Sequence, residues 1–314
     1  MAENSKIEWC HHTFNSWEGC EKVSAGCANC YAERRDKQYH SGEHWGSNGT
    51  RKMMSESYWR QPLKWNRDAV IAGERPRVFC SSLADVFERR KDLIKVRIRL
   101  FDMIQKTSNL DWLLLTKRPQ EVLPILTEAR DLSSECRFED GHQKCVLTHR
   151  WLQDWLDGKP PENMWIGTTV ENQEQADKRI PELLKIPAQM RFLSCEPLLG
   201  PVDLGYSLML HDSPKWDGSC PMHFAGICPE GLRCNPPIHW VITGGESGPN
   251  ARPMDVGWLN SIRDQCLTAG VPVFIKQMGS DYAQRKGYTD PKGGDWTEWA
   301  AEHRIRQFPN AKIT

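Results

Sequence analysis

Three cysteines near the start of the chain carry its clearest chemical signal. Cys20, Cys27 and Cys30 lie in one short segment, with six residues in the first gap and two in the second. A Cys-x-x-Cys pair can direct two thiolates to a single metal, and the earlier cysteine can close over it. Three thiolates leave one corner of an iron–sulfur cubane, or one position on zinc, open for reaction. We therefore predict a metal centre here and favour a [4Fe–4S] cluster over zinc.

Two further groups of metal-ligand residues lie in segments that interrupt the regular pattern of the chain, at residues 130–162 and 205–237. Each segment is expected to be a loop insertion that binds zinc or an auxiliary cluster, or else a loop whose cysteines bind no metal. The residues are Cys136, His142, Cys145 and His149 in the first segment, and Cys220, His223, Cys228 and Cys234 in the second. A structural zinc site at the N-terminal cysteines would need a fourth ligand, which Cys10, His11 or His12 could supply.

The overall composition excludes some classes of protein. The 314 residues include 12 cysteines, and 41 Lys and Arg balance 41 Asp and Glu. Zero net charge argues against a protein that coats nucleic acid, although it is compatible with a local basic pocket. No run of eighteen apolar residues occurs, and the N-terminus lacks the apolar core of a secretory signal. We expect a cytoplasmic protein with no membrane partner, whose clustered cysteines bind metal rather than form disulfides.

The elements that must position these residues alternate between strands and helices. Short apolar runs bounded by turn residues are typical of parallel strands buried on both faces. Between them, segments with apolar residues three and four apart predict amphipathic helices. A first strand is expected at 13–17; the later strands are expected at 78–80, 112–115, 164–167, 191–194, 240–243 and 271–275, and helices at 92–105, 173–185 and 256–269.

The residues that follow these strands favour a barrel over an open sheet. Polar residues stand at nearly every strand end, as in a barrel whose active site is built from those loops. A Rossmann sheet would instead place phosphate-binding glycines after its first strand, and none of that form is present. We predict an α/β fold, a partial TIM-like (β/α) barrel of six to seven parallel strands over residues 1–280, with the two insertions and a C-terminal extension at 281–314. The strand-end residues include Lys117, Arg118, Cys195, Glu196, Gly244, Gly245, Glu246, Ser247 and Lys276.

Several motifs together resemble the phage Gp37/Gp68 family, also called DUF5131. They are Phe14-Asn15-Ser16-Trp17-Glu18-Gly19-Cys20, the cysteine spacing with Tyr31-Ala32-Glu33, Leu113-Leu114-Leu115-Thr116-Lys117-Arg118-Pro119, Phe192-Leu193-Ser194-Cys195-Glu196-Pro197-Leu198 and Gly244-Gly245-Glu246-Ser247-Gly248. The resemblance extends from about residue 5 to residue 280, apart from the two insertions. This family is similar in turn to radical S-adenosylmethionine (SAM) enzymes, which include spore photoproduct lyase.

The resemblance implies a [4Fe–4S] cluster, reductive cleavage of SAM, and an electron donor such as flavodoxin or ferredoxin. Glu246, in the loop with Gly244, Gly245 and Ser247, would accept a hydrogen bond from SAM. Lys117, Arg118 or Lys276 would hold a carboxylate or phosphate. Cys195 would donate a hydrogen atom, and Glu196 would stand beside it. The usual radical enzyme has three residues in the first cysteine gap, whereas this chain has six.

Each of these roles has a simpler alternative. Glu246 could cap a helix, Lys117 and Arg118 could pair with Asp85 or Glu171, and Cys195 could be an inert buried thiol. The resemblance favours a nucleic acid or nucleotide as substrate, which would need a basic patch. Candidates for that patch are Arg34, Arg35, Lys37, Arg51 and Lys52. The competing function is a zinc-stabilised module that binds nucleic acid or protein; a metal hydrolase is disfavoured because histidines are absent from the strand ends.

Overall fold

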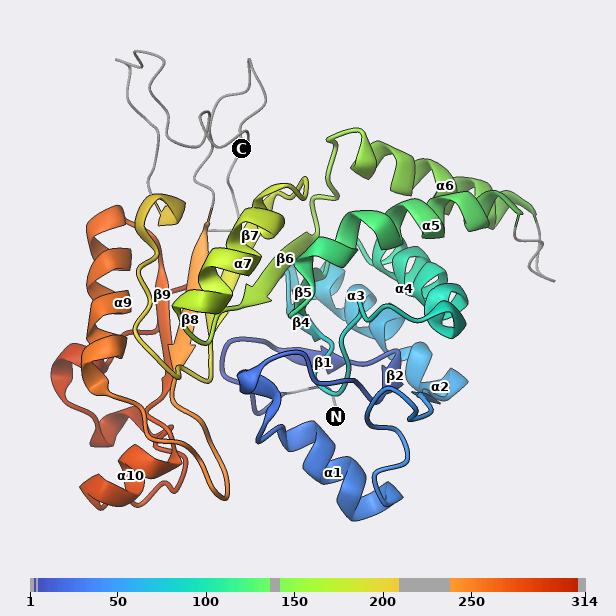
Figure 1. Cartoon of the computed structure of the whole chain (residues 1–314). Helices are drawn as coiled ribbons and strands as arrows, with labels where there is room; N and C mark the ends of the chain where they lie inside the picture. The colour runs from blue at the N-terminus through green and yellow to red at the C-terminus, as the bar shows by residue number, and fades with distance from the viewer. Residues whose placement is uncertain (1–2, 4, 136–141, 209–237, 310–314) are drawn as a thin grey trace, which may run out of the picture. The chain divides into compact units, whose positions relative to one another are not determined.

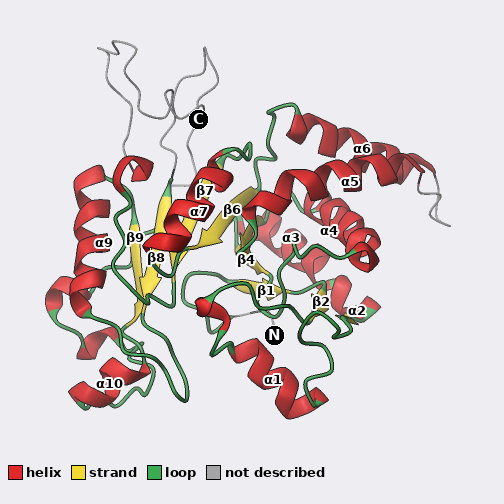
Figure 2. Cartoon of the chain, in the orientation of Figure 1, coloured by secondary structure: helices red, strands yellow, loops and turns green. Residues whose placement is uncertain are grey.

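The computed structural model describes residues 3, 5–135, 142–208 and 238–309. Seven strands form one parallel sheet in the order β1-β4-β5-β6-β7-β8-β9, with helices between them (Figures 1 and 2). This is the predicted α/β, partial TIM-like fold. By packing, the chain divides into two compact units. Unit 1 comprises residues 1–167 and 186–189, and unit 2 comprises residues 168–185 and 190–314.

The strands of unit 1 at 78–80, 112–115 and 164–167 form where the apolar runs predicted them, but the first strand, expected at 13–17, ends at Phe14, and Trp17 belongs to a separate short strand. β1 (His12–Phe14) pairs in parallel with β4 (Arg77–Cys80), which pairs with β5 (Asp111–Thr116). β6 (Met164–Thr169) begins in this unit and is buried along its whole length. A strand that is buried on both faces has no side that contacts water. Its apolar residues therefore form a continuous run and do not alternate with polar ones.

The helices of unit 1 are α3 (Gln61–Ala72), α4 (Ile94–Lys106), α5 (Val122–Glu135) and α6 (His142–Leu156). α4 confirms the helix predicted at 92–105, and a 3-10 turn, η2 (Lys91–Leu93), precedes it. α5 and α6 lie side by side in Figure 1. The first expected insertion therefore contains the end of α5 and the whole of α6.

Smaller elements carry the cysteine segment. β2 (Trp17–Glu18) pairs antiparallel with β3 (Lys52–Met53), outside the main sheet. A 3-10 turn, η1 (Ala25–Cys27), leads to α1 (Tyr31–His40), and α2 (Glu56–Trp59) precedes α3. A further 3-10 turn, η3 (Pro119–Glu121), precedes α5.

Aromatic rings fill the core of unit 1. Phe14 is fully buried, with its ring centre 5.5 Å from that of Trp112 and 5.1 Å from that of Trp59. Both pairs are edge-on, the arrangement that ring quadrupoles favour. Trp112 donates its indole N–H to Thr107 Oγ1 at 2.9 Å, so this buried polar group is satisfied. Phe14 is thus fixed just before the segment that leads to the cysteines.

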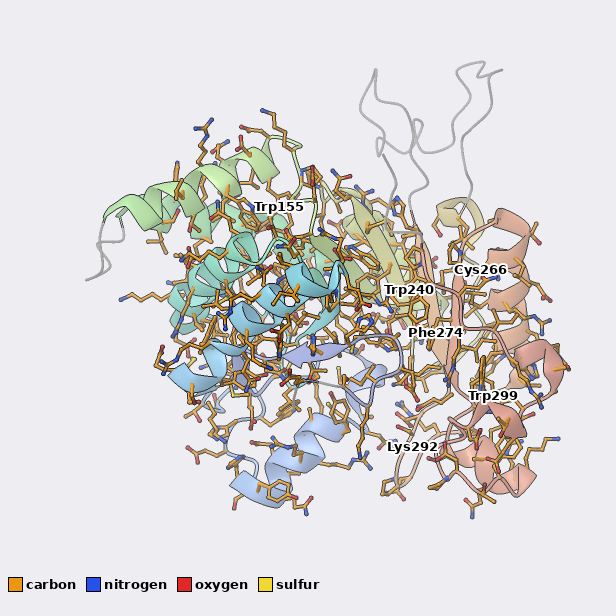
Figure 3. The ribbon with its side chains drawn as sticks, turned by 180° about the vertical axis from the view of Figure 1, so that it is seen from behind. Trp155, Trp240, Cys266, Phe274, Lys292 and Trp299 are labelled. Carbon is orange, nitrogen blue, oxygen red and sulfur yellow. The ribbon has the colours of Figure 1, made fainter. Side chains whose placement is uncertain are left out.

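Unit 2 contains α7 (Gln173–Leu184), β7 (Met190–Cys195), η4 (Gly205–Leu208), β8 (Trp240–Gly244), α9 (Val256–Ala269), β9 (Val273–Gln277), α10 (Ser280–Lys286), η5 (Trp296–Glu298) and η6 (Ala301–His303). β7, β8 and β9 pair in parallel. α9 has the predicted bounds because Asp255 caps its start and Gly270, at φ 67°, ends it. Trp240 of β8 and Phe274 of β9 lie side by side (Figure 3), with their ring centres 6.2 Å apart.

The C-terminal segment packs onto the edge of β9. Ile275 N donates to Ile305 O at 2.9 Å, and Gln307 N donates to Val273 O at 3.0 Å. The Arg306 guanidinium lies 5.3 Å from the ring centre of Trp296 and 5.4 Å from that of Trp299. The predicted C-terminal extension therefore pairs its backbone with the edge strand, whose N–H and C=O groups it satisfies.

In the described part of the chain, no helix has both the length and the apolarity needed to cross a membrane.

Candidate functional site

Hydrogen bonds on both sides fix the start of the cysteine segment. Gly19 N donates to Leu83 O at 3.0 Å, and Cys20 O accepts from Gly46 N at 2.9 Å. Gly19 has φ +117°, and a Cβ there would lie 2.3 Å from His44 O. Only glycine fits this conformation and this close approach. Cys20 is therefore held between the loop after β4 and the loop at 41–51.

Cys27 and Cys30 lie on either side of a turn that leads into α1. Cys27 N donates to Ser24 O at 3.0 Å, closing the 3-10 turn, and Cys30 is the residue before the first turn of α1. Cys20, Cys27 and Cys30 are all half-buried, and none forms a disulfide. Their thiols are thus available as ligands.

The surroundings of Cys30 combine burial with positive charge. Burial raises the pKa of its thiol, and the backbone N–H groups of Glu33 and Ala32 oppose that shift. The charge of Lys117 also lowers the pKa, while the Cys27 thiol raises it. Helix N-termini and cations stabilise thiolates. Of the predicted catalytic residues, Lys117 therefore lies near the cysteine segment.

Arg118 reaches Cys20 from the loop after β5. Its Nη1 lies 3.8 Å from Cys20 Sγ, and its Nη2 donates to Glu21 O at 2.8 Å. Burial raises the pKa of Cys20 to about 12, Asp85 acts in the same direction, and Arg118 opposes both. Arg118 was predicted only as an anion holder or an ion-pair partner; its contact with a cysteine sulfur was not foreseen.

Asp85 fixes Arg118 and the loop around it. Its Oδ2 accepts from Arg118 Nη1 at 2.9 Å and from Lys117 N at 3.1 Å. Its Oδ1 accepts from Thr116 Oγ1 at 2.8 Å and from Phe87 N at 3.0 Å. This is the ion pair between Arg118 and Asp85 that the sequence offered as an alternative. Because Asp85 is 6% exposed and Arg118 7% exposed, solvent screens the pair weakly.

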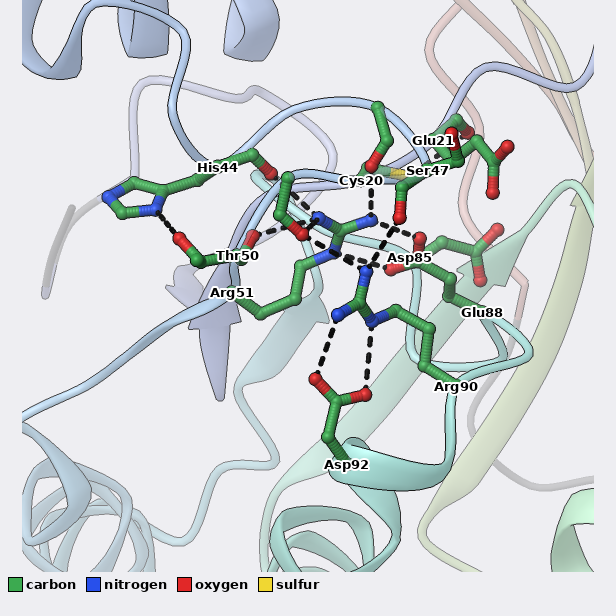
Figure 4. A network of polar contacts seen from close by, with 12 residues as sticks. Cys20, Glu21, His44, Ser47, Thr50, Arg51, Asp85, Glu88, Arg90 and Asp92 are labelled. Atoms are coloured by element: carbon green, nitrogen blue, oxygen red, sulfur yellow. Dashed lines mark hydrogen bonds and ion pairs between the residues drawn. The ribbon is translucent and has the colours of Figure 1, made fainter.

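A second buried arginine, Arg51, holds the 41–51 loop that contacts Cys20. Arg51 donates from Nε to Glu88 Oε2 at 2.9 Å and from Nη2 to Glu88 Oε1 at 2.5 Å (Figure 4). Its Nη1 also donates to the carbonyls of His44, Gly49 and Thr50 at 2.8–2.9 Å. The side chain of Arg51 is fully buried. The prediction of a surface patch is wrong for Arg51, because its guanidinium organises the 41–51 loop.

Other members of the expected basic patch are paired with acids. Arg35 Nη1 lies 3.0 Å from Glu18 Oε1, and Lys37 Nζ lies 2.9 Å from Glu33 Oε1. Lys52 Nζ is 3.7 Å from Glu18 Oε2. These contacts reduce the net positive charge that the helix face presents.

The donor chemistry of the cysteine segment fits a thiolate-bound metal centre. It provides three free thiols from one loop, with cationic Lys117 and Arg118 beside two of them. Thiolates are the usual ligands of both iron–sulfur clusters and zinc. Within the described residues, no three His, Cys, Asp or Glu side chains converge on one point that could hold a metal ion. The fit therefore rests on ligand type, and metal binding at these three residues stays a prediction.

Two of the predicted catalytic residues stand at the end of β7 in unit 2. Cys195 is fully buried, and burial raises the pKa of its thiol, with a further contribution from Cys266. The S–H form is thus strongly favoured, as both a hydrogen-atom donor and an inert thiol require. Glu196 Oε1 accepts from Lys276 Nζ at 2.6 Å, an ion pair between the ends of β7 and β9.

Packing accounts for the two glycines at the end of β8, of which Gly244 is its last residue and Gly245 the next. A Cβ on Gly244 would lie 2.8 Å from Gln277 O, and one on Gly245 would lie 2.3 Å from Met278 O. Gln277 also exchanges hydrogen bonds with Gly245, at 3.0 Å and 2.8 Å. Both glycines are therefore required for the close approach of the backbone at the end of β9. A role in binding SAM remains a prediction.

Glu246 pairs with an arginine of its own loop. Its Oε2 accepts from Arg252 N and Nε at 2.9 Å, and its Oε1 accepts from Arg252 Nη2 at 2.5 Å. The next residue, Ser247, is half-buried. The structure thus gives Glu246 a local ion-pair partner, where the sequence suggested a ligand or a helix cap.

Glu171 in unit 2, which the sequence offers as a possible partner of Lys117 or Arg118, pairs with Arg179. Glu171 is fully buried, and its Oε2 accepts from Arg179 Nη1 at 2.5 Å. Arg179 also donates to Thr169 O at 2.8 Å. Glu171 and Arg179 are eight residues apart, and no helix-surface pairing rule connects residues at that spacing. The pair anchors α7 to the end of β6.

The two expected insertion sites lie largely outside the described residues. This holds for Cys136, Cys220, Cys228 and Cys234 altogether, and for the side chains of His142 and Cys145 in α6. His149 is described, and its Nδ1 lies 2.8 Å from Arg130 O. Metal binding at both insertions stays a prediction.

Comparisons with known proteins give a family and one structural likeness. A family model described as "Protein of unknown function (DUF5131)" matches residues 4–305. No curated protein matches the chain. A solved structure of a spore photoproduct lyase mutant is similar at 12% identity and a TM-score of 0.41, over 78% of this chain and 58% of that one. The chain thus spans less than two thirds of the length of that protein.

Proposed function

The chain belongs to the DUF5131 family, and we propose that it is a radical SAM enzyme with a [4Fe–4S] cluster on Cys20, Cys27 and Cys30. One observation carries the proposal: three free, half-buried thiols share a loop that hydrogen bonds hold at both sides of Cys20. Three cysteine ligands leave one iron open for a substrate or cofactor. When bound, such a cluster would supply the electron for reductive cleavage of SAM to methionine, and the hydrogen atom taken from the substrate would end in 5′-deoxyadenosine.

The protein's own residues would hold and shield the reactants. Lys117, half-buried near Cys30, offers a positive charge to a carboxylate of SAM or to a phosphate. Trp17 and Phe14 are fully buried next to the segment and exclude water from its base. Burial and solvent exclusion tune the potential of a cluster.

Unit 2 contains Glu246 and Cys195, the residues to which the family resemblance assigns SAM binding and hydrogen transfer. Because Arg252 already binds both oxygens of Glu246, a SAM amine or hydroxyl would meet an ion pair rather than a lone carboxylate. Burial keeps Cys195 protonated, which the predicted hydrogen-atom donor requires and an inert thiol shares. A donor must carry its hydrogen at working pH, and a raised thiol pKa ensures that.

The first test is metal content. Protein purified without oxygen is expected to be brown, with about four irons and matching sulfide per chain. Cys20→Ala, Cys27→Ala and Cys30→Ala are each expected to lose iron. Cys266→Ala is the matched control, because Cys266 is a buried thiol of α9 in unit 2 that forms no disulfide. Iron that persists in all three variants would refute the ligand assignment.

The second test is SAM cleavage. Holoprotein reduced with dithionite is expected to release 5′-deoxyadenosine from SAM, and the Cys27→Ala variant is expected to release none. A colourless protein that retains zinc and takes up no iron on reconstitution would instead favour the zinc-stabilised binding module. Single-stranded and duplex DNA, RNA and free nucleotides are the first substrates to compare, since we propose a nucleic acid or nucleotide as the substrate class. Deuterium exchange from labelled substrate into 5′-deoxyadenosine would identify the reacting class.

A further inference from the structure

One guanidinium joins the cysteine segment to the end of β5. Arg118 contacts the sulfur of Cys20 with Nη1 and the carbonyl of Glu21 with Nη2. The same Nη1 donates to Asp85 Oδ2 at 2.9 Å. Asp85 in turn accepts from Thr116 and Lys117, so the position of the guanidinium is fixed by the loop it comes from.

We propose that Arg118 is a positioning residue that raises the reduction potential of the cluster by donating a hydrogen bond to the Cys20 sulfur. This rests on the proposed cluster. Hydrogen bonds to ligand sulfurs and net charge both set cluster potentials. Reduction adds one negative charge to the cluster and its sulfurs, so a donor on a sulfur stabilises the reduced form more than the oxidised form.

Three features of Arg118 make it suited to this role. It is 7% exposed, so water does not replace its hydrogen bond or screen its charge. Its planar fork reaches the sulfur and the neighbouring carbonyl together, which fixes the donor direction. Asp85 balances its charge, so the effect on the potential comes from the hydrogen bond more than from an unbalanced cation.

The test is a potentiometric titration of reconstituted holoprotein, in which the EPR signal of the reduced cluster measures how much of the cluster is reduced. Arg118→Gln is expected to lower the ratio of reduced to oxidised cluster about tenfold at a fixed potential, which corresponds to about 59 mV for a one-electron couple. Arg118→Lys, which keeps the charge without the fork, is expected to fall between Arg118→Gln and the wild type. The control is Arg99→Gln, which removes an arginine paired with Glu56 on the surface of unit 1 and is expected to leave the potential unchanged.

A second variant separates the hydrogen bond from folding and from local charge. Arg118→Gln alone leaves the buried Asp85 carboxylate without its ion pair, which can destabilise unit 1. Asp85→Asn combined with Arg118→Gln removes both charges together, so the local net charge is unchanged while the guanidinium donor is lost. This double variant is expected to bind iron like the wild type and to keep the lowered potential.

The outcomes distinguish this inference from the proposed function. A wild-type potential in an iron-loaded double variant would overturn the role of Arg118 and leave the cluster assignment standing. Loss of iron in a folded double variant would mean that Arg118 builds the site instead of tuning it, and would also overturn the inference. A wild-type protein that takes up no iron would overturn the proposed function itself, and this inference with it.

Discussion

Replacing Arg51 with methionine is expected to lower the free energy of unfolding of unit 1 by about 3–5 kcal/mol, the usual effect of breaking a buried ion pair from one side. The side chain of Arg51 is 0% exposed and that of Glu88 is 2% exposed. Without the guanidinium, the Glu88 carboxylate loses both of its bonds to Arg51, at 2.9 Å and 2.5 Å, in a place where water cannot replace them.

Lost carbonyl hydrogen bonds add to this effect. Arg51 Nη1 serves the carbonyls of His44, Gly49 and Thr50, and each hydrogen bond of this kind contributes about 1 kcal/mol. These terms are not additive with the ion pair, because all of them depend on one side chain. The expected loss in the free energy of unfolding therefore lies in the upper part of the range of about 3–5 kcal/mol.

The assay is urea denaturation, with the midpoint and the slope fitted separately. A shift of the midpoint at constant slope reports a change in stability. Arg99→Met is the matched control: Arg99 pairs with Glu56 at the surface, and its loss is expected to cost about 0.5–1 kcal/mol. Adding Glu88→Leu to Arg51→Met is expected to restore part of the loss, since no unpaired carboxylate remains. A loss below about 1 kcal/mol in Arg51→Met, or no recovery in the double variant, would refute the reasoning.

Three further outcomes are expected. Gly19→Ala, whose Cβ would lie 2.3 Å from His44 O at φ +117°, should reduce both stability and iron uptake. Gly46→Ala, at φ +88° with nothing within 4 Å, should cost only about 1–2 kcal/mol, so equal effects in urea denaturation would argue against the steric explanation. In unit 2, burial lowers the pKa of His239 to about 4, and its Nδ1 accepts from Arg191 N. The unfolded chain then binds the proton more readily, so stability should be complete above pH about 6.5 and should fall by about 3 kcal/mol as the pH drops to about 4. His239→Asn should remove that dependence in melts at several pH values. Cys195→Ser should leave the iron content unchanged but block hydrogen transfer to product, which mass spectrometry of products from deuterated solvent would detect.

The order of strands and helices was predictable because it depends on local pattern. β8 and α9 have nearly the expected bounds: the run Trp240–Thr243 extends by one residue, and α9 has the predicted start and end. Both elements carry their signals within a few residues, as a buried apolar run in one case and as Asp255 and Gly270 in the other. The cysteine spacing is a local signal of the same kind.

The ion pairs around the cysteines were less predictable because they join distant parts of the chain. Arg118 lies 98 residues from Cys20, and Arg51 lies 37 residues from Glu88. In sequence, Arg51 stands beside Lys52 and reads as part of a basic surface. Burial reverses that interpretation, because a guanidinium inside the protein must be paired. The sequence predicts the Arg118–Asp85 pair only as one of several. Polar residues stand at most strand ends, and the sequence does not show which acid pairs with which base.

The charges beside the cysteines bear on the choice between iron and zinc in a way that spacing cannot. Zinc keeps its charge, so a zinc site would gain from Lys117 and Arg118 only a fixed attraction for its thiolates. An iron–sulfur cluster gains an electron during its work, and nearby donors and cations stabilise the more negative state. Because Asp85 neutralises the charge of Arg118, that charge alone would have little effect on the cluster potential. The hydrogen bond from Arg118 to the Cys20 sulfur does not depend on a net charge. Because second-shell hydrogen bonds orient the ligands of zinc as well, the contact itself fits either metal. The measured potential of the double variant therefore distinguishes the two better than any count of cysteines.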